Sequence, residues 1–514
     1  MKIGVLDLLC EGVNQSLFTI PHNLFVVKQH AGIMPQAVSV WCRNLGHDVH
    51  YATYFGFQKP DRLMPDDLDV IFISCFSRGS GLAYALARVF RKQNPGILTI
   101  LGGPHAKQFS HDAVRFFDVV VKECDFQLIK EILTDLPRGI LSSSRALTDL
   151  PCIEERLPEI RKAFFWHGRP IPFVFIPILS SIGCPYACDF CVDWKTPYRL
   201  FPPDRLESDL RFAAACFPQV RINFYDPNFG VTFDRVMEVI ESISHPGKKW
   251  FLTEGSLDAL TDERLVRLDK AGCLCVIPGI ESWSAYTAKS GIKQPDTPAQ
   301  KLERIVDRFY AIRRHIPITQ ANLLFGLDSD KGEEPVALNK AFIADTPWVS
   351  HSLNIPAPFG ETPLFKRYRK QKRILETLPF AFYCKPFLAT TLRHYSPVEF
   401  YEKLVDTFVF MTAPRIQLRG VKLSKSYTHK AYQPIRAVSL TPMIRTMKRI
   451  LGLLKHNRRF RQFHEGRTKT LPEFYHRQYE TLLGPYKNLV SRTDRTPVFP
   501  PENETGKTLQ RKCA

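Results

Sequence analysis

The first 136 residues alternate between short apolar runs and amphipathic segments, and this alternation constrains the fold more than any other feature of the chain. Residues 69–76 form an almost continuous apolar run, as expected of a strand that is buried on both faces. The segment 81–96 has helical periodicity, and a further strand is predicted at 97–105. Repeated units of this length predict an α/β fold with a doubly wound parallel sheet, whose ligands bind at the carboxyl ends of the strands.

A second series of strand and helix patterns occupies residues 172–400. Six such units predict a partial (β/α)6 barrel of the TIM type, with chemistry at the carboxyl ends of its strands. Residues 137–171 between the two series are rich in Pro and Ser and are expected to be a linker, while 401–514 are expected to be basic and mostly helical. The six barrel strands are expected at 173–181, 220–226, 249–255, 274–281, 318–326 and 350–358.

Three cysteines with the spacing Cys-x3-Cys-x2-Cys, Cys184, Cys188 and Cys191, follow the first of these strands. Three thiolates on one short loop can bind three irons of a 4Fe–4S cluster and leave the fourth iron open for a cosubstrate. Three other interpretations remain open. A zinc site would need a fourth ligand, an electron-transfer cluster normally has four cysteines, and the thiols could be merely structural.

The cysteine content also bears on the compartment. The chain has 13 cysteines, an odd number, and its N-terminus lacks the apolar core and cleavage site of a secretory signal. No apolar run reaches the ~18 residues that a membrane-spanning helix needs. We therefore expect a cytoplasmic protein with reduced thiols, in which the ten cysteines outside the motif are mostly small buried side chains.

With its aromatic residue before the last cysteine, Phe190, the motif resembles the signature of the radical S-adenosylmethionine superfamily. The resemblance continues in Tyr-Asp-Pro-Asn-Phe at 225–229, in Gly-Ile-Glu-Ser at 279–282 and in the segment 356–363. It implies that Phe190 lies against the adenine of S-adenosylmethionine and that Asp226 and Glu281 lie near this cofactor. It also implies reductive cleavage of S-adenosylmethionine to a 5′-deoxyadenosyl radical, with electrons from an external flavodoxin- or ferredoxin-type donor.

Residues 1–136 resemble the Rossmann-like, cobalamin-binding domain that precedes the barrel in one subgroup of this superfamily, most clearly at Gly-Gly-Pro-His, residues 102–105. Two departures from the subgroup are visible. The chain has no Asp-x-His-x-x-Gly motif to supply a lower cobalt ligand, and Lys-Glu-Cys-Asp at 122–125 replaces a glycine-rich turn. The resemblance implies the following cobalamin contacts: Ser74, Ser77, Gly102, Gly103 and His105.

The net charge of +19 is concentrated at the C-terminal end, where residues 411–514 hold 22 Lys and Arg against 6 Asp and Glu. Residues 441–463 have the pattern of a basic amphipathic helix. Such a helix could contact an anionic membrane surface, or it could pack on the barrel with a solvated basic face. Nucleic-acid binding is not favoured, because no known RNA-binding motif accompanies the basic residues.

Three functions follow from these observations. The first is cobalamin-dependent methylation of an unactivated carbon in a lipid, a tetrapyrrole or another natural product. The second is a cobalamin-independent radical reaction of the same superfamily, such as cyclisation, oxidation or carbon–carbon coupling. The third is a basic RNA- or membrane-binding protein with a non-catalytic metal site.

Overall fold

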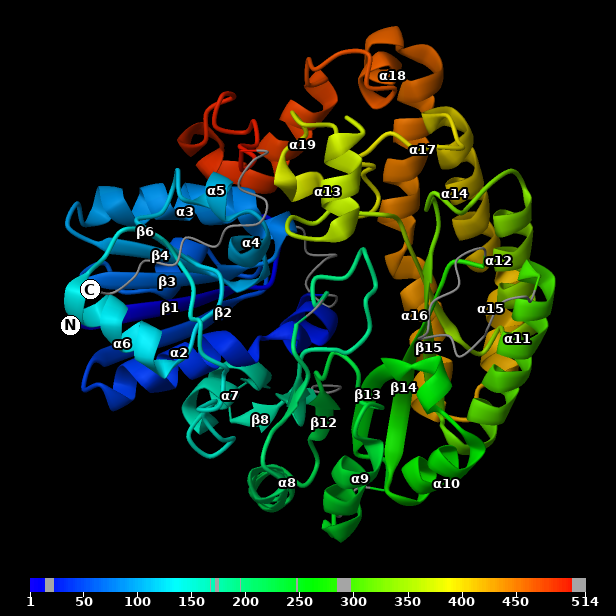
Figure 1. The fold of residues 1–514 in the computed structure, drawn as a ribbon, viewed down its shortest axis with the longest axis horizontal. Coiled ribbons are helices and arrows are strands. Elements are labelled where there is room, and N and C mark those ends of the chain that lie inside the picture. The colour runs from blue at the N-terminus through cyan, green and yellow to red at the C-terminus, as the bar shows by residue number, and fades with distance from the viewer. Residues whose placement is uncertain are drawn as a thin grey trace.

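The computed structural model describes residues 1–13, 23–166, 168–171, 175–194, 196–245, 248–283 and 297–501. Two six-stranded parallel sheets lie side by side in it, and the C-terminal helices pass from one to the other (Figure 1). The expected α/β fold, with a doubly wound sheet followed by a partial barrel, is confirmed.

The N-terminal sheet has the strand order β2-β1-β3-β4-β5-β6, and every neighbouring pair is parallel. The order reverses between β1 and β3, and this switch point is where a doubly wound sheet binds ligands at its carboxyl edge. The strands are β1 (Lys2–Leu8), β2 (Asp48–Tyr54), β3 (Val70–Cys75), β4 (Leu98–Gly102), β5 (Val119–Val121) and β6 (Gly139–Leu141).

Helices cover both faces of this sheet, as the alternating pattern predicts. The Asp125 side chain caps one of them by accepting a hydrogen bond from the Leu128 amide at 2.8 Å. The helices are α2 (Ile33–Asn44), α3 (Ser80–Gln93), α4 (Gly103–Gln108), α5 (Ser110–Ala113), α6 (Phe126–Asp135) and α7 (Leu157–Phe164).

The segment 137–171, expected as a linker, contributes two of these elements. Its β6 extends the first sheet, and its α7 is joined to α2 by an ion pair of 2.6 Å between Arg43 and the buried Glu159. The short β6 consists of half-buried residues without a periodic pattern, so the sequence carries little signal for it.

The second sheet has the order β16-β15-β14-β13-β12-β9 and is also parallel throughout, with β9 and β16 as its two edges. It forms the partial barrel. Its strands are β9 (Phe175–Ile178), β12 (Arg221–Phe224), β13 (Phe251–Ser256), β14 (Cys273–Glu281), β15 (Ile318–Leu324) and β16 (Ser350–Asn354). The helices of this region are α8 (Pro203–Cys216), α9 (Phe233–Ser242), α10 (Asp262–Lys270), α11 (Pro298–His315), α12 (Glu334–Asp345) and α13 (Pro363–Lys370).

The C-terminal helices run from the β16 edge of the barrel over the top of the molecule in Figure 1 and back to the first sheet, where α19 packs on α3. An ion pair of 2.8 Å between Arg88 and Asp494 fastens this end to the N-terminal domain. The helices are α14 (Pro397–Met411), α15 (Pro414–Leu423), α16 (Tyr427–Ser439), α17 (Thr441–His456), α18 (Arg458–His464) and α19 (Glu473–Leu483).

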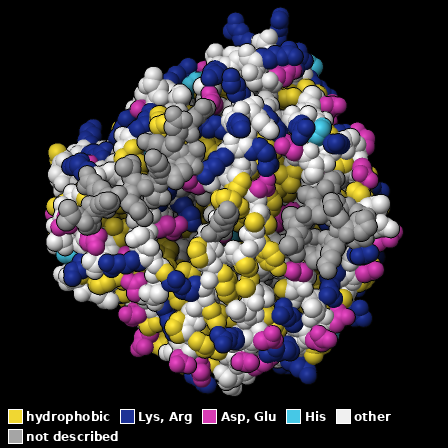
Figure 2. Space-filling model, in the orientation of Figure 1, with side chains coloured by type: hydrophobic (Ala, Val, Ile, Leu, Met, Phe, Trp, Pro, Cys, Tyr) yellow, Lys and Arg dark blue, Asp and Glu magenta, His cyan; other side chains and the backbone are white. Residues whose placement is uncertain are grey.

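The basic amphipathic pattern at 441–463 forms α17 and α18. The apolar side of α17, with Ile444, Met447, Ile450 and Leu454, is buried, and the helix packs on α14. That apolar side is therefore used inside the protein, and the Lys and Arg side chains of α17 are exposed. Lys and Arg side chains also gather at the upper rim of Figure 2, which is where α18 lies in Figure 1. Within the described residues, no helix is long and apolar enough to cross a membrane.

Candidate cofactor-binding site

The three motif cysteines lie on a loop that begins just beyond the carboxyl end of β9. A two-stranded antiparallel ribbon, β10 (Ser181–Ile182) and β11 (Arg199–Leu200), closes the base of the loop. Gly183 stands at this base with φ +72°, and a Cβ there would lie 2.2 Å from the carbonyl oxygen of Pro197. Only glycine fits both the conformation and the space, so the sequence before the first cysteine fixes the narrow base of the loop.

Cys184 and Cys188 are buried and Cys191 is half-buried. A tight turn brings the last two together along the chain, because the Cys191 amide donates to the Cys188 carbonyl at 3.1 Å. Within the described residues, no three His, Cys, Asp or Glu side chains converge closely enough to hold a single metal ion. A 4Fe–4S cluster does not require such convergence, since each cysteine binds a different iron. Three thiol donors on one narrow loop match the number that a cluster with one open iron takes.

The far side of the cysteine loop is fastened to α13, the helix that follows the sixth barrel strand. The Leu364 amide donates to the Asp189 carbonyl at 2.9 Å, and Arg367 pairs with the Asp189 carboxylate at 2.7 Å. Thr362 caps α13 by accepting a hydrogen bond from the Phe365 amide at 3.2 Å. The segment that the sequence singled out at 356–363 thus begins the helix that supports the loop.

Asp226, expected near the cofactor, is buried and turned toward the start of the cysteine loop. Its carboxylate accepts hydrogen bonds from the hydroxyls of Ser180 and Ser181, both at 2.6 Å, and from the Ser180 amide at 3.2 Å. Burial raises the pKa of this carboxyl group against the lowering effect of the serines. In this structure Asp226 braces the chain that leads to Cys184, and its oxygens are occupied by the protein.

Glu281 and Phe190 are only partly buried and so retain surface for a ligand. Glu281 ends β14 with φ +64°, and its carboxylate lies over Gly279, where an added Cβ would be 2.6 Å from Oε1. The next residue is held firmly, because Ser282 donates to Asp330 at 2.5 Å and Lys301 donates to the Ser282 carbonyl at 2.6 Å. Phe190 packs its inner side against the main hydrophobic core. The assignment of both residues to S-adenosylmethionine stays a prediction.

The sequence analysis missed a set of polar residues on the inner face of the barrel. The floor of this face is apolar, with Leu252 and Cys275 packed against Phe175, Ile277 and Ile318. Toward the carboxyl ends the half-exposed positions become polar, for example where Gln320 donates to Asn322 at 3.1 Å. The available signal was the recurrence of polar residues at every second position of otherwise buried strands. These positions are Asn223, Gln320, Asn322, Ser352 and Asn354.

A further polar group at this end of the barrel is Asn228, whose side chain is buried. Its Oδ1 accepts a hydrogen bond from the Ser256 amide at 3.1 Å, but its Nδ2 has no hydrogen-bond partner among the residues that the structure describes. An orphaned buried donor is costly and indicates a position where a ligand or water accepts the bond.

The residues expected to contact cobalamin lie together at the carboxyl edge of the first sheet. Ser74, the last residue but one of β3, pairs with Gly102 of β4, and Gly103 with φ +83° passes so close to Ser74 that a Cβ would lie 2.7 Å from its Oγ. A Cβ on Gly102 would meet no atom of the described residues within 4 Å, so they leave space beside the backbone there. This open edge fits the close approach of a flat ligand.

His105 is enclosed and offers no ring nitrogen to this space. Its Nε2 lies 2.6 Å from Tyr84 Oη and its Nδ1 lies 3.2 Å from Ser77 Oγ, while Tyr84 also donates to Asp112 at 2.7 Å. Burial lowers the pKa of His105 to about 3, so the ring is neutral. In this structure His105 and Ser77 belong to a buried hydrogen-bond network.

Asp7 is a residue of this edge that sequence reasoning missed. It lies at the carboxyl end of β1 beside Ser74 of β3, is buried, and accepts a hydrogen bond from the Gly32 amide at 2.8 Å. Burial raises the pKa of this carboxyl group to about 7. A lone Asp near the end of an apolar strand, as in residues 2–8, was the available signal.

The carboxyl edges of the two sheets face each other. Lys122, directly after β5, pairs with Glu361, beyond β16, at 3.1 Å. Beside this pair, Gly360 touches the end of α4 so closely that a Cβ would lie 1.8 Å from the Gln108 carbonyl oxygen. Burial raises the pKa of Tyr225, directly after β12, and the charges of Glu254 and Asp7 raise it further.

Comparison with known proteins agrees with this two-sheet arrangement, although no protein-family model matches the chain. The bacteriochlorophyllide d C-8(2)-methyltransferase of Chlorobaculum tepidum is 25% identical over 409 residues, which cover 76% of this chain and 86% of that protein. The C-12(1)-methyltransferase of the same organism is 23% identical, over 59% of this chain and 67% of the relative.

A solved structure has the same overall fold. It is that of the radical S-adenosylmethionine methyltransferase TsrM from Kitasatospora setae with cobalamin and a [4Fe-4S] cluster bound, at a TM-score of 0.54 and 15% identity, covering 87% of this chain and 99% of that one. Both the fold and the curated relatives match what the cysteine motif and the N-terminal pattern implied. In sequence the chain is therefore similar to these two methyltransferases, and in fold it is similar to a radical S-adenosylmethionine methyltransferase that binds cobalamin and a cluster.

Proposed function

We propose that this enzyme transfers a methyl group from cobalamin to an unactivated carbon of a small, largely apolar molecule of the tetrapyrrole class. The observation that carries the proposal is that the carboxyl edges of the two sheets face each other, because a substrate in the barrel mouth then lies between the two cofactor sites. When bound, the cluster with S-adenosylmethionine supplies the 5′-deoxyadenosyl radical that removes a hydrogen atom, and cobalamin supplies the methyl group.

Different residues of this chain would hold the cluster and cobalamin. Cys184, Cys188 and Cys191 would hold the cluster, with electrons delivered by a flavodoxin- or ferredoxin-type donor. The open space at Gly102, beside Ser74 and Gly103, would receive cobalamin without a histidine ligand, since His105 is already occupied. Asp226 keeps the start of the cysteine loop in place through its two serine partners.

The lining of the barrel supports a substrate with an apolar body and polar substituents. The floor around Leu252 and Cys275 is apolar, and the polar side chains stand nearer the mouth. Two relatives of the chain are named as methyltransferases of a bacteriochlorophyllide, which has this character. Lipids and other natural products share the character in part, so the substrate class rests on these relatives.

The test compares two leucine variants in protein purified and reconstituted anaerobically with cobalamin. Gly102→Leu fills the open space beside β4, whereas Gly452→Leu makes the same change on α17, where a Cβ also meets no atom within 4 Å. We expect the wild type and Gly452→Leu to retain cobalamin, measured by visible absorbance and mass spectrometry, and Gly102→Leu to lose it. Equal retention by all three proteins would contradict the proposed cobalamin site.

A second candidate is a cobalamin-independent radical reaction. It is favoured by the Lys-Glu-Cys-Asp sequence at 122–125, where the subgroup has a glycine-rich turn. Another relative, the anaerobic magnesium-protoporphyrin IX monomethyl ester cyclase of Rubrivivax gelatinosus, is 22% identical over 48% of this chain and 49% of its own length. This candidate predicts 5′-deoxyadenosine formation by wild-type protein that retains no cobalamin.

A further inference from the structure

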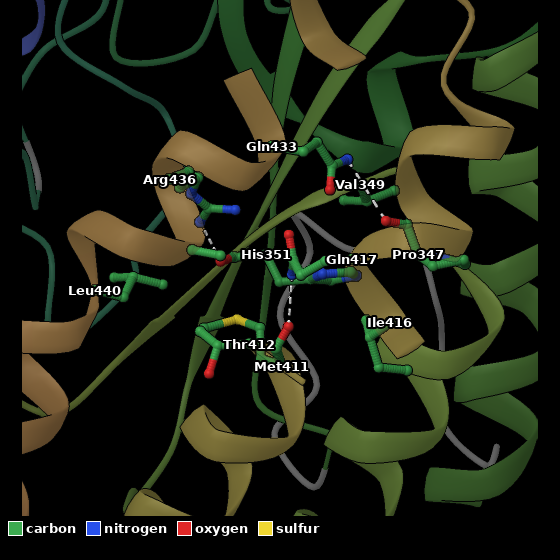
Figure 3. Close-up of a pocket in the computed structure, with 11 residues that line it drawn as sticks. Pro347, Val349, His351, Met411, Thr412, Ile416, Gln417, Gln433, Arg436 and Leu440 are labelled. Carbon is green, nitrogen blue, oxygen red and sulfur yellow. Dashed lines mark hydrogen bonds between the residues drawn. The ribbon is translucent and has the colours of Figure 1, made fainter. Parts of the chain in front are cut away.

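The helix α16 carries polar residues on its buried side, which is the reverse of an ordinary surface helix. Gln433 donates to the Trp348 carbonyl at 3.0 Å, Arg436 donates to the His351 carbonyl, and His429 Nε2 lies 3.2 Å from Ser350 Oγ. Figure 3 shows Gln433 and Arg436 pointing from α16 toward this part of the chain. These donors satisfy polar groups along the outer edge of β16, where a seventh strand would otherwise pair.

The outward side of the same helix is apolar. Tyr427, Ile435 and Val438 are 87%, 64% and 71% exposed, and Ala431 and Pro434 between them are exposed as well. At 100° per residue these five positions form one continuous face. Leu418 on the neighbouring α15 adds a further side chain that is 63% exposed. Single exposed apolar residues are ordinary, but a whole helix face of them indicates a contact surface.

The sequence that carries this face is basic. Residues 407–464 contain 13 Lys and Arg and no Asp or Glu. Those on α15 and α16 or between them, and outside the buried face, are Arg415, Arg419, Lys422, Lys425 and Lys430. Exposed apolar residues flanked by cations are the pattern of a helix that lies in the surface of an anionic membrane.

We propose that the outward face of α15 and α16 docks on an anionic lipid bilayer. A second copy of the chain fits poorly, because two such faces would bring like charges together. A nucleic acid would use the cations but would gain little from Ile435, Val438 and Leu418. The surface is distinct from α17, whose apolar side is buried, and it would hold the barrel beside the phase into which an apolar substrate partitions.

The test is sedimentation of the full-length protein with lipid vesicles, which does not depend on activity or on bound cofactors. We expect binding to vesicles of phosphatidylcholine mixed with phosphatidylglycerol and much weaker binding to phosphatidylcholine alone. Binding should fall between about 0.1 M and about 1 M salt as the Debye length shortens from about 10 Å to about 3 Å.

The double variant Ile435→Glu with Val438→Glu should lower binding to the anionic vesicles by about tenfold or more, because it places two charges in the docking face. The matched control is Val266→Glu on α10, an exposed apolar residue outside the face, which should bind like the wild type. Unchanged thermal unfolding of the variants confirms that both are folded.

Three results would overturn the proposal. The first is no binding to anionic vesicles, and the second is equal loss of binding in the double variant and in the Val266 control. The third is concentration-dependent self-association in analytical ultracentrifugation that the double variant abolishes, since this would assign the face to a second copy. None of these results bears on the proposed methyl transfer, which is tested through cobalamin retention.

Discussion

The contact between Gly360 and Gln108 leads to a specific prediction for Gly360→Ala. The added Cβ would lie 1.8 Å from the Gln108 carbonyl oxygen and 2.9 Å from its carbon, whereas real Cβ contacts stay beyond 3.0 Å. The two backbones must therefore separate by more than 1 Å, and neither is a flexible side chain. Overpacking of this kind typically costs about 1–3 kcal/mol, and we expect the upper part of this range.

The effect should be local as well as global. We expect a lower midpoint of thermal unfolding, and faster amide hydrogen exchange in residues 103–110 and 355–362, where the two sheets meet. The matched control, Gly452→Ala on α17, adds a methyl group that meets no atom within 4 Å and should stabilise the helix by up to about 1 kcal/mol. If Gly360→Ala unfolds and exchanges like the wild type, the facing edges of the two sheets are not packed as described.

Two further predictions concern buried carboxyl groups. Asp226→Asn replaces an acceptor of three hydrogen bonds with an amide whose nitrogen can only donate. It should lower the free energy of unfolding in denaturant by about 1–3 kcal/mol and should lower the iron content of reconstituted protein. Unchanged iron content would show that the brace does not position the cysteine loop. The pKa of the Asp7 carboxyl group is about 7 in the folded protein and about 3.8 in the unfolded chain. The protonated group therefore stabilises the folded protein at low pH, and this stabilisation is lost as the pH rises from about 3.8 to about 7. Asp7→Asn, which imitates the protonated form, should therefore gain free energy of unfolding relative to the wild type between pH 5 and pH 8, by at most about 3 kcal/mol, and an equal difference at both pH values would refute the assignment.

Both sheets could be predicted from the sequence because parallel strands buried on both faces leave long apolar runs, as at 69–76 and 98–102. The six barrel strands carry weaker signals, because buried residues alternate with half-exposed, partly polar ones in strands such as β12, β15 and β16. The strand β6 was not, because three half-buried residues, Gly139–Leu141, carry no periodicity. The polar inner side of α16 was also missed, because its pattern reverses the rule that surface helices bury their apolar residues.

The residues of the candidate site could be located in the sequence, but the directions of their side chains could not be predicted. A motif places Asp226 and His105 at the ends of strands, yet it does not determine the direction of a side chain. In the structure Asp226 turns toward Ser180 and Ser181, and His105 toward Tyr84 and Ser77. These partners lie far away along the chain, or on another strand, and the choice among them depends on tertiary packing.

The central claim is that Cys184, Cys188 and Cys191 hold a cluster that cleaves S-adenosylmethionine. The most direct measurement is the iron content and the 5′-deoxyadenosine yield of anaerobically reconstituted, dithionite-reduced protein, compared with a triple alanine variant at these cysteines. The matched control is a triple alanine variant at Cys124, Cys152 and Cys216, which lie outside the motif. We predict about four irons per chain and 5′-deoxyadenosine for the wild type and the control, and neither for the motif variant. A motif variant that keeps its iron and its product, or a wild type that has neither, would contradict the claim.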